Sequence, residues 1–434
     1  MRTASAARPR GPVAALAAAT ALLALTTAYA PPVRSGVSRA APAPRCAPDD
    51  GGITVPQGAC AVVVGEEPGG RQVLVTPTGD LFMAVAGGGT HAGVVALRDT
   101  DGDGQADVTR HYGPSGGTGI ALRDGYLYFA PDDAVLRWRL APGALEPAGP
   151  PDTIVQDLPT GGDHRSKSIA VDAAGNLFVD VGSATNSCQQ ANRMLESPGV
   201  DPCTELEIRA GIWRFRADRL HQRQADGTRW ATGIRNGVAF TLDDHGRLWA
   251  VQHGRDQLFQ NWPKLYDAHR GAELPAEEVL LVRQGDDFGW PYCYYDQLVR
   301  KLVLAPEYGG DGVKVGRCAD KKPPVYGFPG HWAPDAVVFA DRTPFPGLGT
   351  GLFIAFHGSW NRAPEPQAGY RVTFLPLNGD KPGAPVTFAD GFAGPDSARG
   401  RARYRPDGLA RGPDGSIYIT SDAGGRIWRV VPRP

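Results

Sequence analysis

The first candidate for chemistry is a histidine beside a carboxylate in a loop. Asp163 and His164 stand just before Ser168, where a run of alternating apolar and polar residues begins. A histidine titrates near neutral pH, and an adjacent carboxylate can orient its ring for proton transfer. A surface histidine with a chance acidic neighbour is the commoner arrangement, because both residue types are frequent in loops. The place directly before a strand makes His164 a candidate general base and Asp163 its partner.

Comparable polar groups stand before or after other strand-like runs. Arg235 and Asn236 precede one run, Arg403 and Arg405 precede the last one, and Asp422 follows it. Arginine binds carboxylates and developing oxyanions, and asparagine both donates and accepts. Two arginines at i and i+2 of an extended segment point to the same side and could clamp a polyanion, although a solvated basic loop has the same pattern. Their convergence favours a small, multiply charged ligand.

A third pattern places carboxylates at alternate positions of one loop. Asp99, Asp101, Asp103 and Asp107 occupy positions 1, 3, 5 and 9, and Gln105 at position 7 offers a backbone carbonyl. Oxygen ligands at these spacings suit Ca²⁺. No glutamate stands at position 12, so the loop is not an EF-hand. We expect a structural calcium site remote from catalysis, with a solvated acidic turn as the alternative.

A hairpin pattern that recurs six times must position these groups. Each copy alternates apolar and polar residues around a turn with Asp or Gly, which is typical of a β-hairpin. The copies are 73–87, 120–131, 168–183, 238–254, 336–358 and 408–425. Similar third strands follow several copies, at 94–99, 135–140, 211–218, 370–377 and 426–431. The repeats predict an all-β fold, a six-bladed β-propeller, with a pair of β-sandwiches as the alternative. Insertions at 184–210 and 255–334 are expected on one face, around the ligand site.

Composition excludes some classes of function. The 434 residues include 45 Lys+Arg and 46 Asp+Glu, for a net charge of −1, which does not suit a nucleic-acid binder. The 57 glycines and 39 prolines, with 42% hydrophobic residues, indicate an ordered, turn-rich protein with a large core.

The N-terminus has the features of an export signal. A basic start is followed by an apolar run from Val13 that ends in Ala28-Tyr29-Ala30. This pattern predicts a signal peptide rather than a stable membrane anchor, hence a secreted, periplasmic or extracellular protein. We expect residues 1–40 to form signal peptide and leader, and residues 41–434 to form one propeller domain.

Six cysteines fit an exported protein. They fall into three sequence-local pairs, Cys46/Cys60, Cys188/Cys203 and Cys293/Cys318. Three disulfides are expected, although six cysteines allow 15 connectivities and spacing does not choose among them. The spacing does not suit a metal site, because no C-x-x-C occurs.

Taken together, the motifs resemble those of the glucose/sorbosone dehydrogenases, and more closely the sorbosone branch. The similarity runs from about residue 70 to the C-terminus, and the order of the Asp-His, Arg-Asn and Arg-x-Arg elements is its most specific feature. The matching stretches are GGDHRSKSIAVDAAGNLFVDVGSATN, TGIRNGVAFTLDDHGRLWAVQHGRDQ, GDDFGWPYC, LFIAFHGSWNR and RYRPDGLARGPDGSIYITSDAGGRIWRV. The resemblance implies a six-bladed propeller that uses pyrroloquinoline quinone (PQQ) with Ca²⁺.

The resemblance also implies roles in the reaction. His164 would take the proton of the substrate's C1 hydroxyl while hydride passes to the quinone, and Asp163 would orient His164. Arg235 would stabilise the oxyanion that grows on the quinone oxygen, with Asn236 beside it. Ca²⁺ would polarise the same oxygen, held largely by backbone carbonyls of the loop Gly254-Arg255.

Other residues would hold the cofactor. Arg403 and Arg405 would bind PQQ carboxylates, and Asp422 falls on a cofactor-contacting position. The glucose enzymes place a lysine on the cofactor near HGSWNR; no lysine occurs there, and Arg362 or His357 would substitute.

Two further departures concern the loops. The glucose enzymes have a glutamine where this chain has residues 115–118, and a Gly-Pro where it has Gly254-Arg255. These changes affect cofactor contacts and substrate identity more than the fold.

We therefore expect a secreted PQQ- and Ca²⁺-dependent dehydrogenase of a sugar or sugar aldehyde that passes electrons to a separate acceptor. One alternative is a metal-dependent propeller lactonase or other hydrolase, which needs an inward set of carboxylates that the sequence does not show convincingly. Another is a non-catalytic propeller that binds a glycan or a protein, because fold alone does not imply activity.

Overall fold

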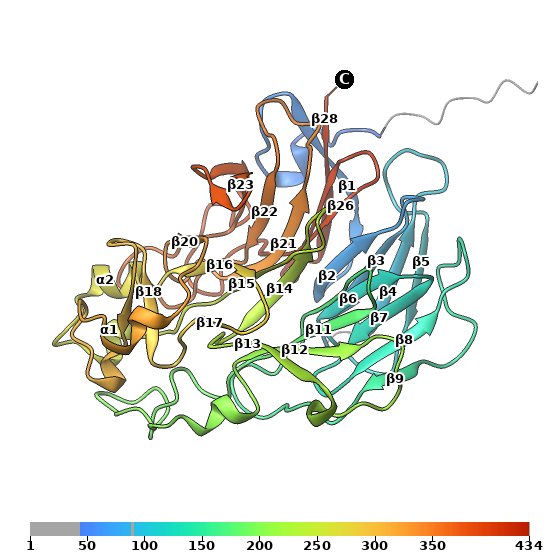
Figure 1. The fold of residues 1–434 in the computed structure, drawn as a ribbon. Coiled ribbons are helices and arrows are strands. Elements are labelled where there is room, and N and C mark those ends of the chain that lie inside the picture. Colours follow the sequence, from blue (N-terminus) through green and yellow to red (C-terminus); the bar gives the residue numbers. More distant parts are fainter. Residues whose placement is uncertain (1–43, 88–90, 434) are drawn as a thin grey trace, which may run out of the picture. The chain divides into compact units, whose positions relative to one another are not determined.

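The computed structural model describes residues 44–87 and 91–433, and most of its regular structure is antiparallel β-sheet (Figure 1). The predicted signal peptide and leader, residues 1–40, lie outside the described residues. No helix in the described ranges is long and apolar enough to cross a membrane.

Six sheets form six blades, which confirms the predicted β-propeller. The first contains β2 (Gly70–Val75), β3 (Leu81–Val85), β4 (Gly93–Arg98) and β5 (Val108–Tyr112). The second contains β6 (Gly119–Arg123), β7 (Tyr126–Ala130), β8 (Val135–Arg139) and β9 (Asp152–Val155). The third contains β10 (Ile169–Val171), β11 (Asn176–Val181), β12 (Gly211–Arg216) and β13 (Thr228–Thr232), with β17 (Asp286–Asp287) added in parallel at its edge.

The other three blades follow the same order. The fourth contains β14 (Gly237–Leu242), β15 (Leu248–Gln252), β16 (Glu277–Val282) and β20 (Tyr326–Phe328). The fifth contains β21 (Pro334–Ala340), β22 (Gly351–Phe356) and β23 (Arg371–Asn378), with β24 (Lys381–Pro382) and β25 (Val386–Ala389) pairing β23. The sixth contains β26 (Pro406–Arg411), β27 (Ile417–Ser421), β28 (Arg426–Pro432) and β1 (Ala59–Glu66).

The first and last strands of the described residues close the ring. β1 pairs antiparallel with β28, from Ala59 opposite Pro432 to Glu66 opposite Arg426. The innermost strands β2, β6, β10, β14, β21 and β26 each contact the next one round, and β26 contacts β2. The polar groups at the ends of these strands are therefore brought around one channel.

Apolar side chains between neighbouring blades form the core. Trp428 and Phe353 are fully buried in a cluster that joins the fifth and sixth blades, and Trp249 is fully buried where the fourth meets the fifth. Period-two alternation places one face of each sheet against the next blade. Burial of these faces, at roughly 25 cal/mol per Å² of apolar surface, is the main force that holds the blades together.

The predicted insertion at 255–334 needs correction. β16 and β20 within it belong to the fourth blade, and β17 extends the third. The segments outside the blades carry α1 (Leu258–Asn261), α2 (Ala268–Glu273) and the hairpin of β18 (Cys293–Asp296) with β19 (Lys301–Leu304). The long gap between β15 and β16 hid the third strand of this blade from the repeat pattern.

Disulfides join the sequence-local cysteines, Cys46 to Cys60, Cys188 to Cys203 and Cys293 to Cys318. Their Cα atoms lie 5.7, 6.2 and 5.8 Å apart. This confirms the expected count of three and selects one of the open connectivities.

Candidate functional site

The candidate site lies where the innermost strands begin and their partners end. Because each inner strand is antiparallel to the second strand of its blade, both of these ends open on the same face. His164 precedes β10 and Arg235 precedes β14, whereas Ser183 follows β11 and His357 follows β22. The channel mouth therefore collects polar groups from several blades, as the repeat pattern predicted.

Ser183 fixes the orientation of His164. The His164 Nδ1 lies 2.9 Å from Ser183 Oγ and 3.0 Å from the Ser183 carbonyl oxygen. The Ser183 hydroxyl donates to the Thr185 carbonyl at 2.7 Å, and the Ser183 N–H donates to the Arg235 carbonyl at 2.8 Å. Both Ser183 oxygens thus accept from Nδ1–H, which leaves a lone pair on Nε2.

Burial keeps His164 neutral at neutral pH. Burial lowers its pKa well below the usual 6.5, and the nearby Arg235 charge lowers it further. No hydrogen bond to Nε2 occurs within residues 44–87 and 91–433. Gly182 allows the close packing, because a Cβ there would lie 2.7 Å from the His164 Cβ. His164 has the protonation state and the free nitrogen that a general base needs.

Asp163 does not orient His164 in this structure. Its carboxylate accepts from Arg193, with the NH2 and Nε atoms at 2.9 and 3.0 Å, and from Asn192 at 3.4 Å. Adjacent side chains in this loop point apart, so Asp163 faces the insertion at 184–210 while His164 faces Ser183. The expected Asp-His pair is therefore replaced by a Ser-His pair.

Arg235 is buried and bound on several sides. It donates to the Asn186 carbonyl and side chain at 3.0 Å each, to the Gly254 carbonyl at 2.9 Å and to Asp256 at 2.9 Å. Burial lowers the pKa of Arg235, and Asp256 opposes this effect. Burial disfavours ionised Asp256, but Arg235, His331 and Arg193 outweigh it and hold the pKa of Asp256 well below its usual range. The guanidinium is thus a fixed cation beside the base.

The loop Gly254-Arg255, which the sequence analysis assigned to Ca²⁺, lies beside Arg235. The Gly254 N–H donates to Glu277 at 3.1 Å, and the Arg255 side chain turns inward to Glu307 and to the Asp256 carbonyl. The Arg255 carbonyl could hold a cation, whereas the Gly254 carbonyl already accepts from Arg235 at 2.9 Å and would share its oxygen with that guanidinium.

Asn236 borders this loop. Its carbonyl accepts from the His253 N–H at 3.2 Å, and its side chain is half-buried. Its amide forms no hydrogen bond inside the described ranges and is free to meet a ligand.

Arg403 and Arg405 do not form the predicted clamp. Arg405 donates to the His357 carbonyl at 3.1 Å and to the Gly358 carbonyl at 2.6 Å. Arg403 is exposed and lies over the Tyr404 ring, 4.9 Å from its centre. The i, i+2 rule fails because β26 begins only at Pro406, so these residues are not in a regular strand.

Arg362 is also unsuited to the role expected of it. Its guanidinium is buried and donates to the carbonyls of Ala272, Gly330 and Pro366 and to the Glu273 carboxylate. These bonds tie the loop after β22 to α2 and occupy four of its five donor hydrogens. His357, the other substitute considered, lies at the channel mouth.

His357 and Asp422, both named from the sequence, belong to a charged cluster in the channel whose other members were missed. His357 Nε2 lies 2.9 Å from Asp422, and His357 Nδ1 lies 3.6 Å from Asp335. Arg71 NH1 lies 2.6 Å from Asp407 and 3.8 Å from Asp422. Inward carboxylates are therefore present, contrary to expectation. The signal was a Pro-Asp dipeptide that opens both β21 and β26.

Part of this cluster has the composition of a metal site. Asp335, His357 and Asp407 can each place one ligand atom within 4.8 Å of the others. The Arg71 guanidinium, however, already supplies a cation to Asp407. His253 also contacts this cluster, since its Nε2 lies 2.8 Å from Asp335.

A hollow of about 660 Å³ opens beside this cluster. Arg71, Thr118, Asp132, Arg165 and Ser166 are among the residues that line it. Residues 116–118, just before β6, also line it, and its walls are largely polar. His164, Arg235 and Gly254 are not among the residues that line it.

Two buried polar atoms near the mouth lack partners among the described residues. These are Arg71 Nε and Asn361 Oδ1. The Asn361 amide donates to Asp256 at 2.7 Å, and Asp256 also accepts from Arg235. The unsatisfied Arg71 donor could bind an acceptor of a ligand, whereas the unsatisfied Asn361 oxygen could accept from a ligand donor or bind a cation.

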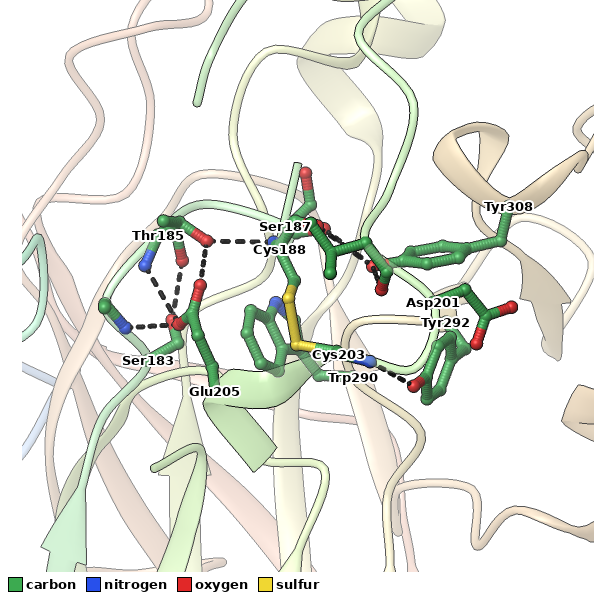
Figure 2. The surroundings of a disulfide bond; sticks show 12 residues. Ser183, Thr185, Ser187, Cys188, Asp201, Cys203, Glu205, Trp290, Tyr292 and Tyr308 are labelled. Carbon is green, nitrogen blue, oxygen red and sulfur yellow. Dashed lines mark hydrogen bonds between the residues drawn. A yellow bond between two sulfur atoms is a disulfide. The ribbon is translucent and has the colours of Figure 1, made fainter. Parts of the chain in front are cut away.

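The insertion at 184–210 lies against the site, as predicted. Figure 2 shows the Cys188–Cys203 disulfide with Thr185 and Glu205 on one side and Tyr292 on the other. Thr185 Oγ1 accepts from the Cys188 N–H at 2.9 Å, and Tyr292 accepts from the Cys203 N–H at 2.9 Å. These bonds anchor the segment that supplies Asn186 to Arg235.

The acidic loop of the first blade lies between β4 and β5. Asp99, Asp101 and Asp107 can bring one oxygen each within 4.8 Å of the others. Asp103 accepts from the backbone N–H and side chain of Gln105, and neither residue belongs to that group.

The family model TrAA12-like matches residues 59–433. An uncharacterised protein of Borreliella burgdorferi is 31% identical over 272 residues, which is 62% of this chain and 60% of that protein. A "pyrroloquinoline quinone-dependent pyranose dehydrogenase" of Coprinopsis cinerea is 28% identical over 234 residues, 46% of this chain and 30% of that protein. The chain thus matches less than two thirds of either relative's length.

Solved structures share the fold. The calcium structure of the Trichoderma reesei Carbohydrate-Active Enzymes family AA12 protein superposes with a TM-score of 0.70 at 19% identity, over 88% of this chain and 97% of that one. The holo PQQ domain of the Coprinopsis cinerea pyranose dehydrogenase gives 0.69 at 20% identity, over 90% and 98%. The PQQ-bound aldose sugar dehydrogenase of Streptomyces coelicolor gives 0.54 at 17% identity, over 87% and 99%.

Proposed function

Because the chain belongs to the TrAA12-like family, we propose that it is a PQQ- and Ca²⁺-dependent dehydrogenase that oxidises a sugar or sugar aldehyde. The observation that carries this proposal is the neutral His164, with a free Nε2, beside the buried Arg235 cation. The Coprinopsis cinerea relative, named for PQQ-dependent pyranose oxidation, supports the cofactor and the substrate class.

The chain's own residues would perform the proton transfer. The substrate hydroxyl gives its proton to His164 Nε2, while Ser183 keeps the proton on Nδ1 in place. The imidazolium that forms retains two hydrogen-bond acceptors at Nδ1, which lowers its cost. PQQ, when bound, supplies the acceptor for the hydrogen and two electrons that leave the sugar carbon. Arg235 would stabilise negative charge that develops beside the base.

Other residues would bind the cofactor and its cation. Arg405, Asn236 and Asn361 border the mouth, and Asp422 is bonded to His357 there. Arg362 is left out of this set because its guanidinium is committed elsewhere, and Arg403 has a peripheral place at most. The carbonyls of Gly254 and Arg255 would hold Ca²⁺.

Three further proposals follow from the sequence. A second, structural Ca²⁺ would bind Asp99, Asp101 and Asp107. Residues 41–434 would be one propeller domain preceded by a signal peptide and leader at 1–40, and three disulfides support an oxidising, exported location. Electrons would pass to a separate acceptor.

A metal-dependent hydrolase is the second candidate, because Asp335, His357 and Asp407 converge in the channel. Such a site needs an open coordination position, and Arg71 stands against Asp407 where a cation would bind. This contact favours the dehydrogenase.

The test is reconstitution of the purified protein with PQQ and Ca²⁺, followed by dye reduction with aldoses and sorbosone. The dehydrogenase should reduce the dye with at least one sugar and retain cofactor absorbance through gel filtration. If neither dye reduction nor cofactor absorbance is observed, and lactones are hydrolysed in a metal-dependent way, the hydrolase is favoured. If dye reduction, cofactor absorbance and hydrolysis are all absent, a non-catalytic binding protein is favoured.

A further inference from the structure

A fully buried lysine lies next to the loop that carries His164. Lys167 has 0% of its surface exposed and stands just before β10. Removing an ammonium group from water costs several kcal/mol unless hydrogen bonds and an opposite charge compensate. The structure supplies both, so the position of Lys167 has a specific physical basis.

The Lys167 ammonium binds the loop on both sides of His164. Its Nζ donates to the Pro159 carbonyl at 3.0 Å and to the Arg165 carbonyl. One acceptor precedes His164 in the chain and the other follows it directly. Lys167 therefore closes the segment 159–167 into a loop with His164 on it, and the reaction described above makes no use of Lys167 itself.

A buried carboxylate connects this region to the Arg235 loop. Asp180 on β11 is 1% exposed, and its Oδ1 accepts from the Gly237 N–H at 3.3 Å. The Asp180 N–H donates to the Ser168 carbonyl at 3.0 Å, next to Lys167. A Cβ at position 237 would lie 2.7 Å from Asp180 Oδ1, so glycine is required there. Asp180 thus touches the chain next to Lys167 and the chain two residues beyond Arg235.

The electrostatics of the two side chains are complementary. Burial raises the pKa of Asp180, and the Lys167 ammonium is the charge that most opposes this. Burial lowers the pKa of Lys167 to about 8, and Asp180 is the charge that most opposes that shift. Each buried group favours the charged form of the other through space, without a hydrogen bond or ion pair between them among the described residues.

We propose that Lys167 and Asp180 are positioning residues that hold the His164 loop and the Arg235 loop in one arrangement, so that base and guanidinium face the same reacting group. Neither side chain touches the substrate. The proposal rests on the proposed dehydrogenase activity for its kinetic consequence, but the arrangement itself can be measured without turnover.

The test compares Lys167→Met and Lys167→Gln with Lys322→Met. Lys322 is a suitable control because its Nζ also donates to a carbonyl, that of Leu281 at 2.9 Å, and also contacts an aspartate, but on the edges of the third and fourth blades. A displacement of the base by about 1 Å costs about 10²-fold in rate. Lys167→Met should therefore lower kcat by about 10- to 100-fold with the Kd for PQQ changed less than threefold, and Lys322→Met should keep kcat.

Lys167→Gln keeps an N–H group that can donate to one of the two backbone carbonyls, and it should give an intermediate kcat. Asp180→Asn keeps the shape and one acceptor but removes the carboxylate that most favours the charged ammonium, and should lower kcat in the same direction. If Lys167→Met does not fold, these two variants carry the test. Folded variants with kcat within threefold of the parent would overturn the proposal.

The second readout uses the protein without cofactor. Nitrogen-detected NMR of His164 gives its pKa and its tautomer. The charges that face this ring are Arg235, Asp256 and His253, and none is changed by the variants. The parent and Lys322→Met should show Nδ1–H and a pKa below 6.5, whereas Lys167→Met should show mixed tautomers and a pKa moved toward 6.5. If the tautomer and pKa of His164 are the same in Lys167→Met and the parent, the positioning role is refuted even if no sugar is oxidised. Failure of the positioning role is therefore distinguishable from failure of the proposed dehydrogenase activity.

Discussion

Replacement of Ser183 by aspartate should change the basicity of His164 in a calculable way. In the parent, the Nδ1–H of His164 is held by neutral oxygens at 2.9 and 3.0 Å, and burial keeps the pKa of the ring below 6.5. A carboxylate in place of the hydroxyl puts a negative charge about 4 Å from the ring. At an effective dielectric constant of about 20 this attraction is about 4 kcal/mol, or about 3 pKa units at most. Desolvation of the new carboxylate reduces the net shift to roughly 1–3 units.

The assay is the pH dependence of kcat/KM, with NMR titration of His164 as an independent measure. Because the base must be unprotonated, activity is lost as pH falls through the pKa of His164. This acid limb should lie below pH 6.5 in the parent and move to higher pH by roughly 1–3 units in Ser183→Asp. Asparagine has the size of aspartate but no charge, so Ser183→Asn should leave the acid limb near its position in the parent. Equal limbs for Ser183→Asp and Ser183→Asn would refute the assignment of Ser183 as the partner of His164.

Three further outcomes are expected. Asp163→Asn should lower kcat by less than about fivefold, the equivalent of one net hydrogen bond of about 1 kcal/mol, because the carboxylate faces the insertion; a loss beyond about 100-fold would restore Asp163 as the partner of the base. Loss of the disulfide in Cys188→Ser with Cys203→Ser, which closes a segment of 15 residues, should lower the free energy of unfolding by about 3 kcal/mol in denaturant titration, and an unchanged midpoint would contradict this role. Asp101→Asn should reduce the Ca²⁺ bound per chain by one in equilibrium dialysis, whereas Asp124→Asn on a neighbouring hairpin should not; equal stoichiometry in both would remove the acidic loop as a site.

The fold could be predicted because its information is local. Alternation of apolar and polar residues around turns such as that at Gly175, where φ is 76°, specifies each hairpin without reference to the rest of the chain. The pairing of β1 with β28 was not predictable in this way, since the two strands are more than 350 residues apart.

The site was predicted only in part, because its contacts cross between blades. His164 and Arg235 stood out through their residue types and their place before a strand. Ser183 gave no comparable signal, since a serine after a strand is common and its contact with His164 depends on how the loop turns. Asp163 seemed the natural partner through adjacency in sequence, yet neighbouring side chains in an irregular loop usually diverge.

The channel acids show a different limit. Asp335 and Asp407 each follow a proline at the start of an inner strand, so a comparison of equivalent repeat positions could have found them. Arg71 belongs to the same set of positions on the first blade. Their mutual neutralisation depends on the closed ring, which composition and spacing do not describe.

The most direct test of the account is to separate cofactor binding from proton transfer at His164. The parent and His164→Gln are loaded with PQQ and Ca²⁺, the bound cofactor is measured by its absorbance after gel filtration, and single-turnover oxidation of the best sugar is followed. We predict equal cofactor occupancy and a rate lower by about 10²- to 10⁴-fold in His164→Gln, the contribution expected of a general base. A rate within threefold of the parent at equal occupancy would contradict the account.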